Sequence, residues 1–177
     1  LLVIAIWLII VLSSSFLARK FIHNTNELSR KITHIGTGVV IPLAWWLDIP
    51  SKTAIFFSIL ITLCLIINYQ MRWLIALEDI KRKSYGTIAY GASITILLFL
   101  FWSKQPEAVC AGVMVMAFGD GLAGLTGKQF KSSTWKVFNQ EKSIVGTTSM
   151  LIVSCLILIG INLLTNANLE LNKILII

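Results

Sequence analysis

The chain alternates long apolar runs with short polar segments. Six runs approach the ~20 residues that a helix needs to cross a bilayer, and they lie at 1–18, 34–50, 53–75, 84–102, 107–126 and 144–165. They lack the alternation with a period of two residues that strands of a membrane barrel show. The pattern predicts an all-α polytopic membrane helical bundle of six transmembrane helices, formed as a single domain over residues 1–177. Residues 171–177 could open a seventh helix.

The first run could also be read as the core of a secretory signal peptide, because Ser13, Ser14 and Ser15 follow it. However, it lacks a basic start and a cleavage site of the small-x-small type. We therefore expect a spanning helix there.

Composition supports a membrane protein and excludes two other classes. Hydrophobic residues make up 56% and charged residues 13%, against about 45–50% and 25% in soluble domains. The net charge of +7 does not indicate nucleic-acid binding, because the basic residues lie in short loops between apolar runs and form no polar, aromatic-interleaved surface. Cys64, Cys110 and Cys155 lie inside apolar runs without a CxxC spacing or a nearby histidine, which argues against a disulfide or metal framework.

The basic residues gather in alternate loops. Twelve of the 15 Lys and Arg fall in loops 19–33, 70–83 and 127–143, and only Lys52, Lys104 and Lys173 fall elsewhere. The crowded positions are Arg19, Lys20, Arg30, Lys31, Arg72, Lys81, Arg82, Lys83, Lys128, Lys131, Lys136 and Lys142. Alternate loops lie on one side of the membrane, and the positive-inside rule makes that side cytoplasmic. We expect the active site to face it.

Asp120 is the one acid that falls well inside an apolar run; the other seven lie in loops or at helix ends. A carboxylate inside the bilayer costs about 2.5–3.5 kcal/mol on insertion scales, so it normally faces a polar cavity or a cation. It lies seven residues before Gly127, hence about 10 Å from the cytoplasmic end of a helix at 1.5 Å per residue. That depth suits a metal or phosphate pocket. The alternative is a carboxylate buried against a lysine for structure.

Glycines surround Asp120, and Gly119-x-Gly121-x-x-Gly124 matches the dinucleotide fingerprint literally. No βαβ unit contains it, so that fingerprint does not apply. Small residues at Ala117, Gly121, Ala123 and Gly127 can also serve close helix packing. Packing and the approach of a ligand to the backbone are compatible roles.

Two more polar clusters lie at the same ends of predicted spans. Arg30 and Lys31 precede His34, which enters the apolar run one turn after Arg30, and such cations can hold a phosphate or an anionic head group. Lys142 and Ser143 precede Gly146 at a predicted helix start, where a cation, hydroxyls and free N–H groups can bind phosphate. Ser143 is also a plausible N-cap. We expect the three clusters to converge.

Together these clusters resemble the phytol kinase and dolichol kinase family, which is related to the phosphatidate cytidylyltransferases. The resemblance runs from about Glu27 to Thr148. It is carried by Arg30-Lys31-x-x-His34-x-x-x-Gly38, by Ser84–Gly91, by Asp120-x-x-Ala123-x-x-x-Gly127, and by Lys142-Ser143-x-x-Gly146-Thr147. The chain departs from the family at Lys131, where a second glycine is usual, and at Val145, where an acid is common. It therefore has one candidate carboxylate fewer.

The resemblance implies CTP-dependent phosphorylation of a membrane-embedded isoprenoid alcohol, most simply phytol to phytyl phosphate. It implies Asp120 as the Mg²⁺ ligand, His34 as the base, and Lys142 as a further catalytic group. Arg30 and Lys31 would neutralise the transferring phosphate. The implied nucleotide-binding residues are Gly119, Gly121, Ala123, Gly127, Ser143, Gly146 and Thr147.

Three alternatives stay open. A CTP-dependent diacylglycerol kinase and a cytidylyltransferase that makes CDP-diacylglycerol use the same nucleotide and a related intramembrane Asp. A non-enzymatic alternative is a small transporter in which Asp120 binds a proton or a cation. Transporters usually carry polar or broken helices in two corresponding halves, and the sequences of the second and fifth runs do not mirror one another.

Overall fold

The computed structural model describes residues 1–21, 26–71, 85–137 and 140–165, which are mostly helical. The elements in this part of the chain are α1 (Leu2–Phe21), α2 (Asn26–Gly38), α3 (Val40–Trp46), α4 (Ser51–Met71), α5 (Gly86–Phe101), α6 (Pro106–Met114), the π-helical turn η1 (Val115–Gly119), α7 (Asp120–Gln129), β1 (Thr134–Val137), β2 (Gln140–Ser143) and α8 (Ile144–Leu164).

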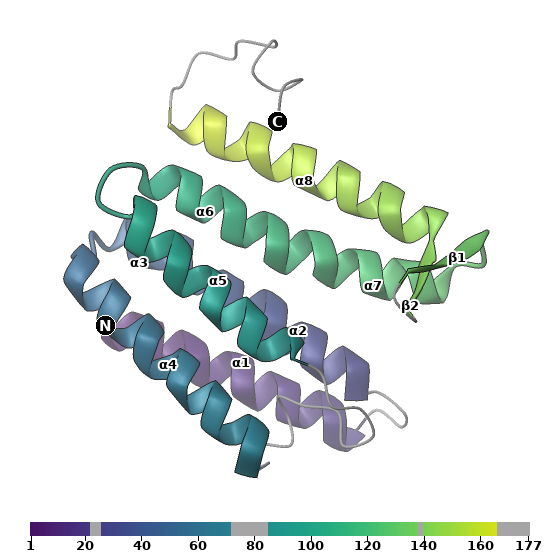
Figure 1. The fold of residues 1–177 in the computed structure, drawn as a ribbon, viewed down its shortest axis with the longest axis horizontal. Helices are drawn as coiled ribbons and strands as arrows, with labels where there is room; N and C mark the ends of the chain where they lie inside the picture. Colours follow the sequence, from purple (N-terminus) through teal and green to yellow (C-terminus); the bar gives the residue numbers. More distant parts are fainter. Residues whose placement is uncertain (22–25, 72–84, 138–139, 166–177) are drawn as a thin grey trace.

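The helices run back and forth between two ends of the molecule, which confirms the predicted all-α helical bundle (Figure 1). Among the described residues, four helical segments are long and apolar enough to cross a membrane: Leu2–Phe21, Ser51–Met71, Pro106–Gln129 and Ile144–Leu164. The apolar helix α5 is shorter, with 16 residues. The total of six spans stays a prediction, and residues 171–177 lie outside the described part of the chain.

The second predicted span differs from its expected form. Its helix begins at Asn26 rather than near residue 34, and it is interrupted at Val39 between α2 and α3. Pro42 explains the interruption, because proline has no N–H to donate to the carbonyl of Gly38 four residues earlier. Because the helix begins at Asn26, Arg30 and Lys31 lie inside a helix and not in a loop. Lys31 is only 6% exposed.

The fifth predicted span is one helical segment with a change of pitch in its middle. The π-helical turn η1 joins α6 to α7 and ends directly before Asp120. On the side of η1 away from Asp120, α6 packs with α3 and α5 in a buried apolar cluster that includes Ile41, Leu98, Val109 and Val113. Trp102 Nε1 closes this end by donating to the Ile49 carbonyl at 3.0 Å. The core therefore lies at the end of the bundle opposite the polar clusters.

The connection expected as a loop at 127–143 contains an antiparallel hairpin of β1 and β2. Thr134 pairs with Ser143 and Val137 with Gln140. The hairpin was not predicted, since the segment lacks the Asn-Gly or Asp-Gly turn that announces one. It leads directly into α8.

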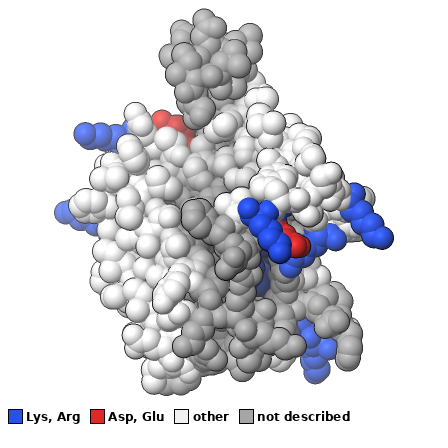
Figure 2. Space-filling view, turned by 45° about the vertical axis from the view of Figure 1, so that its right-hand side comes forward, with Lys and Arg blue, Asp and Glu red and all other residues white. Residues whose placement is uncertain are grey.

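The end that carries the hairpin also carries most of the basic residues described. They lie at the end of α1, in the first turns of α2, at the end of α7 and in the hairpin, which are at the right of Figure 1. Figure 2 turns this end forward and shows Lys and Arg side chains gathered over its right half. Lys52 and Lys104 lie at the opposite helix ends, in the first turn of α4 and between α5 and α6. The basic residues predicted in loop 70–83 lie outside the described residues.

Candidate functional site

Helix α2 is fixed against α1 by a buried cluster of hydroxyl groups. Ser15 Oγ lies 2.7 Å from Ser29 Oγ and donates to the Ser29 carbonyl, while Thr33 Oγ1 donates to Ser15 Oγ at 2.8 Å. All three residues are at most 5% exposed. Polar groups buried in this way bond to one another because no water or lipid can satisfy them. The cluster sets the rotation of α2 and so directs its other face toward η1 and α7.

On that other face, Lys31 forms an ion pair with Asp120. Its Nζ donates to Asp120 Oδ2 at 2.7 Å and to the Asp120 backbone carbonyl at 3.0 Å. The side chain of Lys31 is 8% exposed, whereas that of Asp120 is 55% exposed. The lysine is therefore held within the protein while the carboxylate remains accessible. The pair joins two of the three predicted clusters across 89 positions of sequence.

His34 lies beside the same carboxylate, one turn after Lys31 on α2. Its Nε2 is 4.0 Å from Asp120 Oδ2 and 3.3 Å from the Met116 carbonyl. A carbonyl only accepts hydrogen bonds, so this contact assigns the proton to Nε2 and leaves the lone pair of a neutral imidazole on Nδ1. The π-helical turn presents the Met116 carbonyl, which no sequence pattern had indicated.

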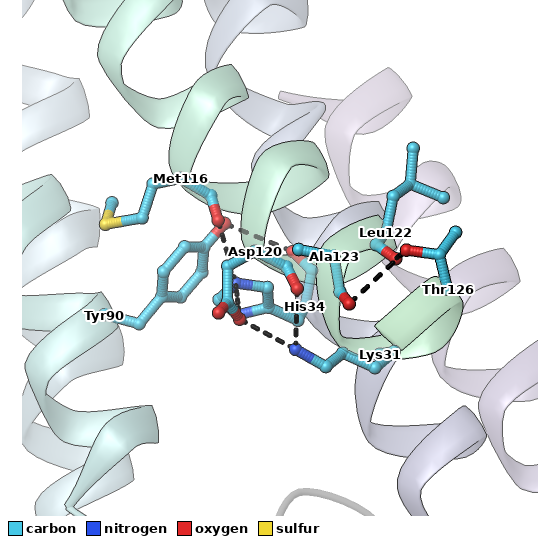
Figure 3. Close-up of polar contacts among 8 residues, drawn as sticks. All are labelled: Lys31, His34, Tyr90, Met116, Asp120, Leu122, Ala123 and Thr126. Carbon is cyan, nitrogen blue, oxygen red and sulfur yellow. Dashed lines mark hydrogen bonds and ion pairs between the residues drawn. The ribbon is translucent and has the colours of Figure 1, made fainter. Parts of the chain in front are cut away.

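Tyr90 of α5 covers His34 from the other side. The two rings lie 4.0 Å apart at their centres, and the Tyr90 hydroxyl donates to the His34 carbonyl at 3.2 Å. Figure 3 shows Tyr90 and Met116 on one side of Asp120 and Lys31 on the other. Tyr90 falls in the Ser84–Gly91 segment that carries the resemblance, which was its one signal in the sequence.

The glycines around Asp120 allow these helices to approach. A Cβ at Gly121 would lie 2.6 Å from Ile35 Cγ1, and a Cβ at Gly124 would lie 2.9 Å from Lys31 Cε. Real Cβ atoms do not make contacts this short. The missing side chain at Gly124 thus leaves room for the Lys31 side chain to extend to Asp120. The structure also shows the role in close helix packing that the sequence suggested for Gly121.

The third cluster joins the other two through α7. Ser143 is the N-cap of α8, as expected, and its Oγ accepts from the Gly146 N–H at 3.1 Å. The first turn of α8 packs on the end of α7, where a Cβ at Gly127 would lie 3.4 Å from Gly146 Cα. Lys142 is exposed and within electrostatic range of Asp120.

The predicted site residues thus lie near one end of the bundle, though in different surroundings. Lys31 and His34 contact Asp120 directly, whereas Arg30 lies within electrostatic range of His34. The remaining predicted nucleotide-binding residues take part in helix packing or capping: Gly119, Gly121 and Ala123, with Gly127, Ser143, Gly146 and Thr147. Their contact with a nucleotide stays a prediction.

A cavity of ≈ 200 Å³ adjoins the carboxylate. It is lined by His34, Gly86, Ala89, Tyr90, Ser93, Met116 and Asp120. A second hollow of ≈ 360 Å³ lies at the opposite end of the bundle, between the connections around Ile49 and Ser103. Only the first one contacts residues of the predicted clusters.

Within the described ranges, no three His, Cys, Asp or Glu side chains come together. A protein site made entirely of such ligands is therefore absent from this part of the chain. Magnesium is often bound by one or two carboxylates plus substrate phosphates, and a half-exposed Asp120 suits that donor set. Lys31 and His34 both face Oδ2, and Figure 3 draws no contact to the other carboxylate oxygen.

Comparison with characterised proteins points to one family. The chain is 37% identical over 149 residues to the phytol kinase of Synechocystis sp., a match that covers 84% of this chain and 64% of that protein. It is 29% identical to a probable chloroplastic phytol kinase 1 of Oryza sativa, over 76% of this chain and 46% of that protein. Phytol kinase 1 of Arabidopsis thaliana is 27% identical over 77% of this chain and 48% of its own length.

The chain thus spans between about half and two thirds of the length of these curated relatives. No protein-family profile matches it. No solved structure matches it either.

Proposed function

We propose that this chain, a member of the phytol kinase family by sequence, transfers a phosphoryl group from a nucleotide to the hydroxyl of an isoprenoid alcohol held in the bilayer. Phytol is the first expected substrate, as the names of its relatives suggest. The observation that carries the proposal is that Lys31 and His34 both lie against the half-exposed carboxylate of Asp120.

The charged side of the site suits phosphate. Phosphoryl transfer depends mainly on positioning and on neutralising charge. Lys31 and Lys142 supply cations near Asp120, and Arg30 adds a third in the turn before His34. Mg²⁺, if bound by Asp120 and the phosphates of CTP, would neutralise charge that develops during transfer. CTP and Mg²⁺ rest on the resemblance alone.

The proton of the alcohol needs an acceptor, and His34 is placed to be one. The alcohol oxygen forms a bond to the γ-phosphorus while the bond from that phosphorus to the β–γ bridging oxygen breaks, and the nucleoside diphosphate leaves. The hydroxyl proton passes to His34 Nδ1, because Nε2 carries the proton that it donates to the Met116 carbonyl. Tyr90 holds the imidazole ring in place through a tilted ring contact.

We further propose that this end of the bundle faces the cytoplasm. The helix ends around Asp120 carry most of the described basic residues (Figure 2). Lys and Arg are retained on the cytoplasmic side of membrane proteins. A water-soluble nucleotide would reach the site from that side.

One observation favours the transporter alternative. The second and fifth predicted spans are both irregular, at Val39 and at η1, and they meet where a Cβ at Gly38 would overlap Ala117. Transporters place broken helices in corresponding positions of two halves. However, the sequences of these two spans do not mirror one another, as corresponding halves of a transporter would.

Labelled CTP separates these classes. Membranes that contain the protein are incubated with phytol, dolichol or diacylglycerol, and with CTP labelled either in the γ-phosphate or in the cytidine. We expect the γ-phosphate label on phytol and no cytidine label on lipid. Cytidine label on lipid would indicate a cytidylyltransferase. Phosphate label on diacylglycerol alone would indicate a diacylglycerol kinase. The absence of label on any lipid would reject the kinase proposal. Membranes with Asp120→Asn give the background.

A further inference from the structure

The site around Asp120 has two chemically different sides. On one side lies the ammonium group of Lys31. On the other lie the ring of Tyr90 and the side chain of Met116, with His34 and Asp120 between the two sides (Figure 3). A phosphate donor belongs on the charged side, because apolar walls cannot compensate the free-energy cost of removing its water of hydration. The apolar side needs a different ligand.

The cavity of ≈ 200 Å³ lies on this apolar side. Its α5 wall consists of Gly86, Ala89, Tyr90 and Ser93, which recur at the spacing of one helix face. Ala89 is exposed although it lies in an apolar helix, so its small side chain leaves open space beside it. The opposite wall is Met116 of η1 and Asp120 of α7.

The cavity lies between α5 and the η1–α7 segment, and His34 of α2 also lines it. Farther along the bundle the two walls meet, since a Cβ at Gly112 would lie 3.6 Å from Leu97 Cδ1 and Leu98 packs with Val109 and Val113 in the core. Toward Asp120, Tyr90 and Met116 line the cavity. Because the core on the other side is packed, we expect a chain to enter the cavity beside the site and not through the core.

We propose that this cavity binds the hydroxyl end of the acceptor, a single-chain aliphatic alcohol, with Ala89 setting the width of the site. The inference rests on the proposed function, whose acceptor it places. A cavity of ≈ 200 Å³ is smaller than the roughly 300–1,000 Å³ that encloses a whole drug-sized ligand. It holds the hydroxyl and the first carbons, and the rest of the tail lies in the bilayer.

The same dimensions favour a single chain over diacylglycerol. The two acyl arms of diacylglycerol diverge next to the carbon that carries its free hydroxyl, whereas a cavity of ≈ 200 Å³ has room for the first carbons of one chain. A single chain needs one path out of the cavity. The hydroxyl at its tip would lie next to His34, which takes its proton, and within reach of a phosphate held by the charged side.

Photo-crosslinking tests this placement without relying on turnover. A long-chain primary alcohol with a diazirine near its hydroxyl end is the probe, and phytol is the competitor. We expect labelling within residues 86–93 and at Met116, competed by phytol but not by diacylglycerol. Ala89→Leu should reduce that labelling at least tenfold and raise KM for phytol about tenfold, with KM for CTP unchanged.

A matched variant completes the experiment. Ala92→Leu adds the same side chain on α5 outside the cavity lining, and it should label and turn over as the unaltered protein does. Labelling elsewhere in the chain, labelling that phytol does not compete, or wild-type labelling of Ala89→Leu would overturn the inference. Labelling at the cavity without phosphate transfer would reject the kinase and keep the site. Normal transfer with an unchanged KM for phytol in Ala89→Leu would keep the kinase proposal and reject the acceptor site in this cavity.

Discussion

Replacement of Lys31 by methionine asks whether the Lys31–Asp120 pair is a structural contact or part of the reaction site. Methionine retains an apolar stem of similar length and removes only the ammonium group. Two hydrogen bonds of 2.7 and 3.0 Å are lost. Bonds to charged groups contribute about 1.5–3 kcal/mol each. Because the Asp120 side chain is 55% exposed, solvent screening reduces the total, and we expect a loss of about 1–2 kcal/mol.

A double-mutant cycle separates the two roles. Thermal unfolding in detergent and phosphate transfer to phytol are measured for Lys31→Met, Asp120→Asn and the double variant. In stability, the double variant should lose less than the two single variants together, with a coupling of about 1 kcal/mol. In activity, each single variant should lose at least about 100-fold, or about 2.7 kcal/mol of transition-state stabilisation, and the double variant should recover none of it.

The control is Lys131→Met, which removes an exposed lysine from the same end of the bundle. It should leave stability and activity near those of the unaltered protein. A double variant that regains activity would refute the reasoning, because the pair would then serve only to neutralise a buried charge. Unchanged activity in Lys31→Met would refute it equally.

Three further predictions concern the surroundings of the site. Gly124→Ala places a Cβ 2.9 Å from Lys31 Cε, so the flexible lysine should move away from Asp120. Phosphate transfer should then fall at least tenfold with little change in melting temperature. Unchanged transfer would contradict the account. Ser143→Ala removes the N-cap bond to the Gly146 N–H and should cost about 1 kcal/mol of stability in unfolding measurements, whereas Ser143→Thr should retain most of it. In a protein without native cysteines, Lys136→Cys should react with an impermeant maleimide only from the cytoplasmic side and Lys104→Cys only from the other side; the reverse pattern would invert the proposed orientation.

The sequence was sufficient for the class of fold and for the side chains that meet at Asp120. Apolar runs of spanning length and basic residues in alternate loops both follow from the cost of placing charge in lipid, and the helices do run between one basic end and one less basic end. The cost of a carboxylate inside an apolar run singled out Asp120, and its partners Lys31 and His34 came from a cluster predicted to converge with it. Ser143 followed from capping chemistry alone.

Contacts between distant segments could not be predicted in the same way. That Lys31 rather than Arg30 pairs with Asp120 depends on the rotation of α2, which the Ser15–Ser29 contact with α1 determines. The π-helical turn that presents the Met116 carbonyl leaves no signature in the order of apolar residues. Pro42, by contrast, is a signal in the sequence that marks the interruption of the second span.

The most direct test of the account is phosphate transfer by Asp120→Asn. Membranes with equal amounts of the folded variant and of the unaltered protein are supplied with phytol and γ-labelled CTP, and labelled phytyl phosphate is measured. Asparagine keeps the size of the side chain and removes its charge, so the account predicts product at the level of membranes without the protein. Turnover within a few-fold of that of the unaltered protein would show that the carboxylate is not part of the reaction site.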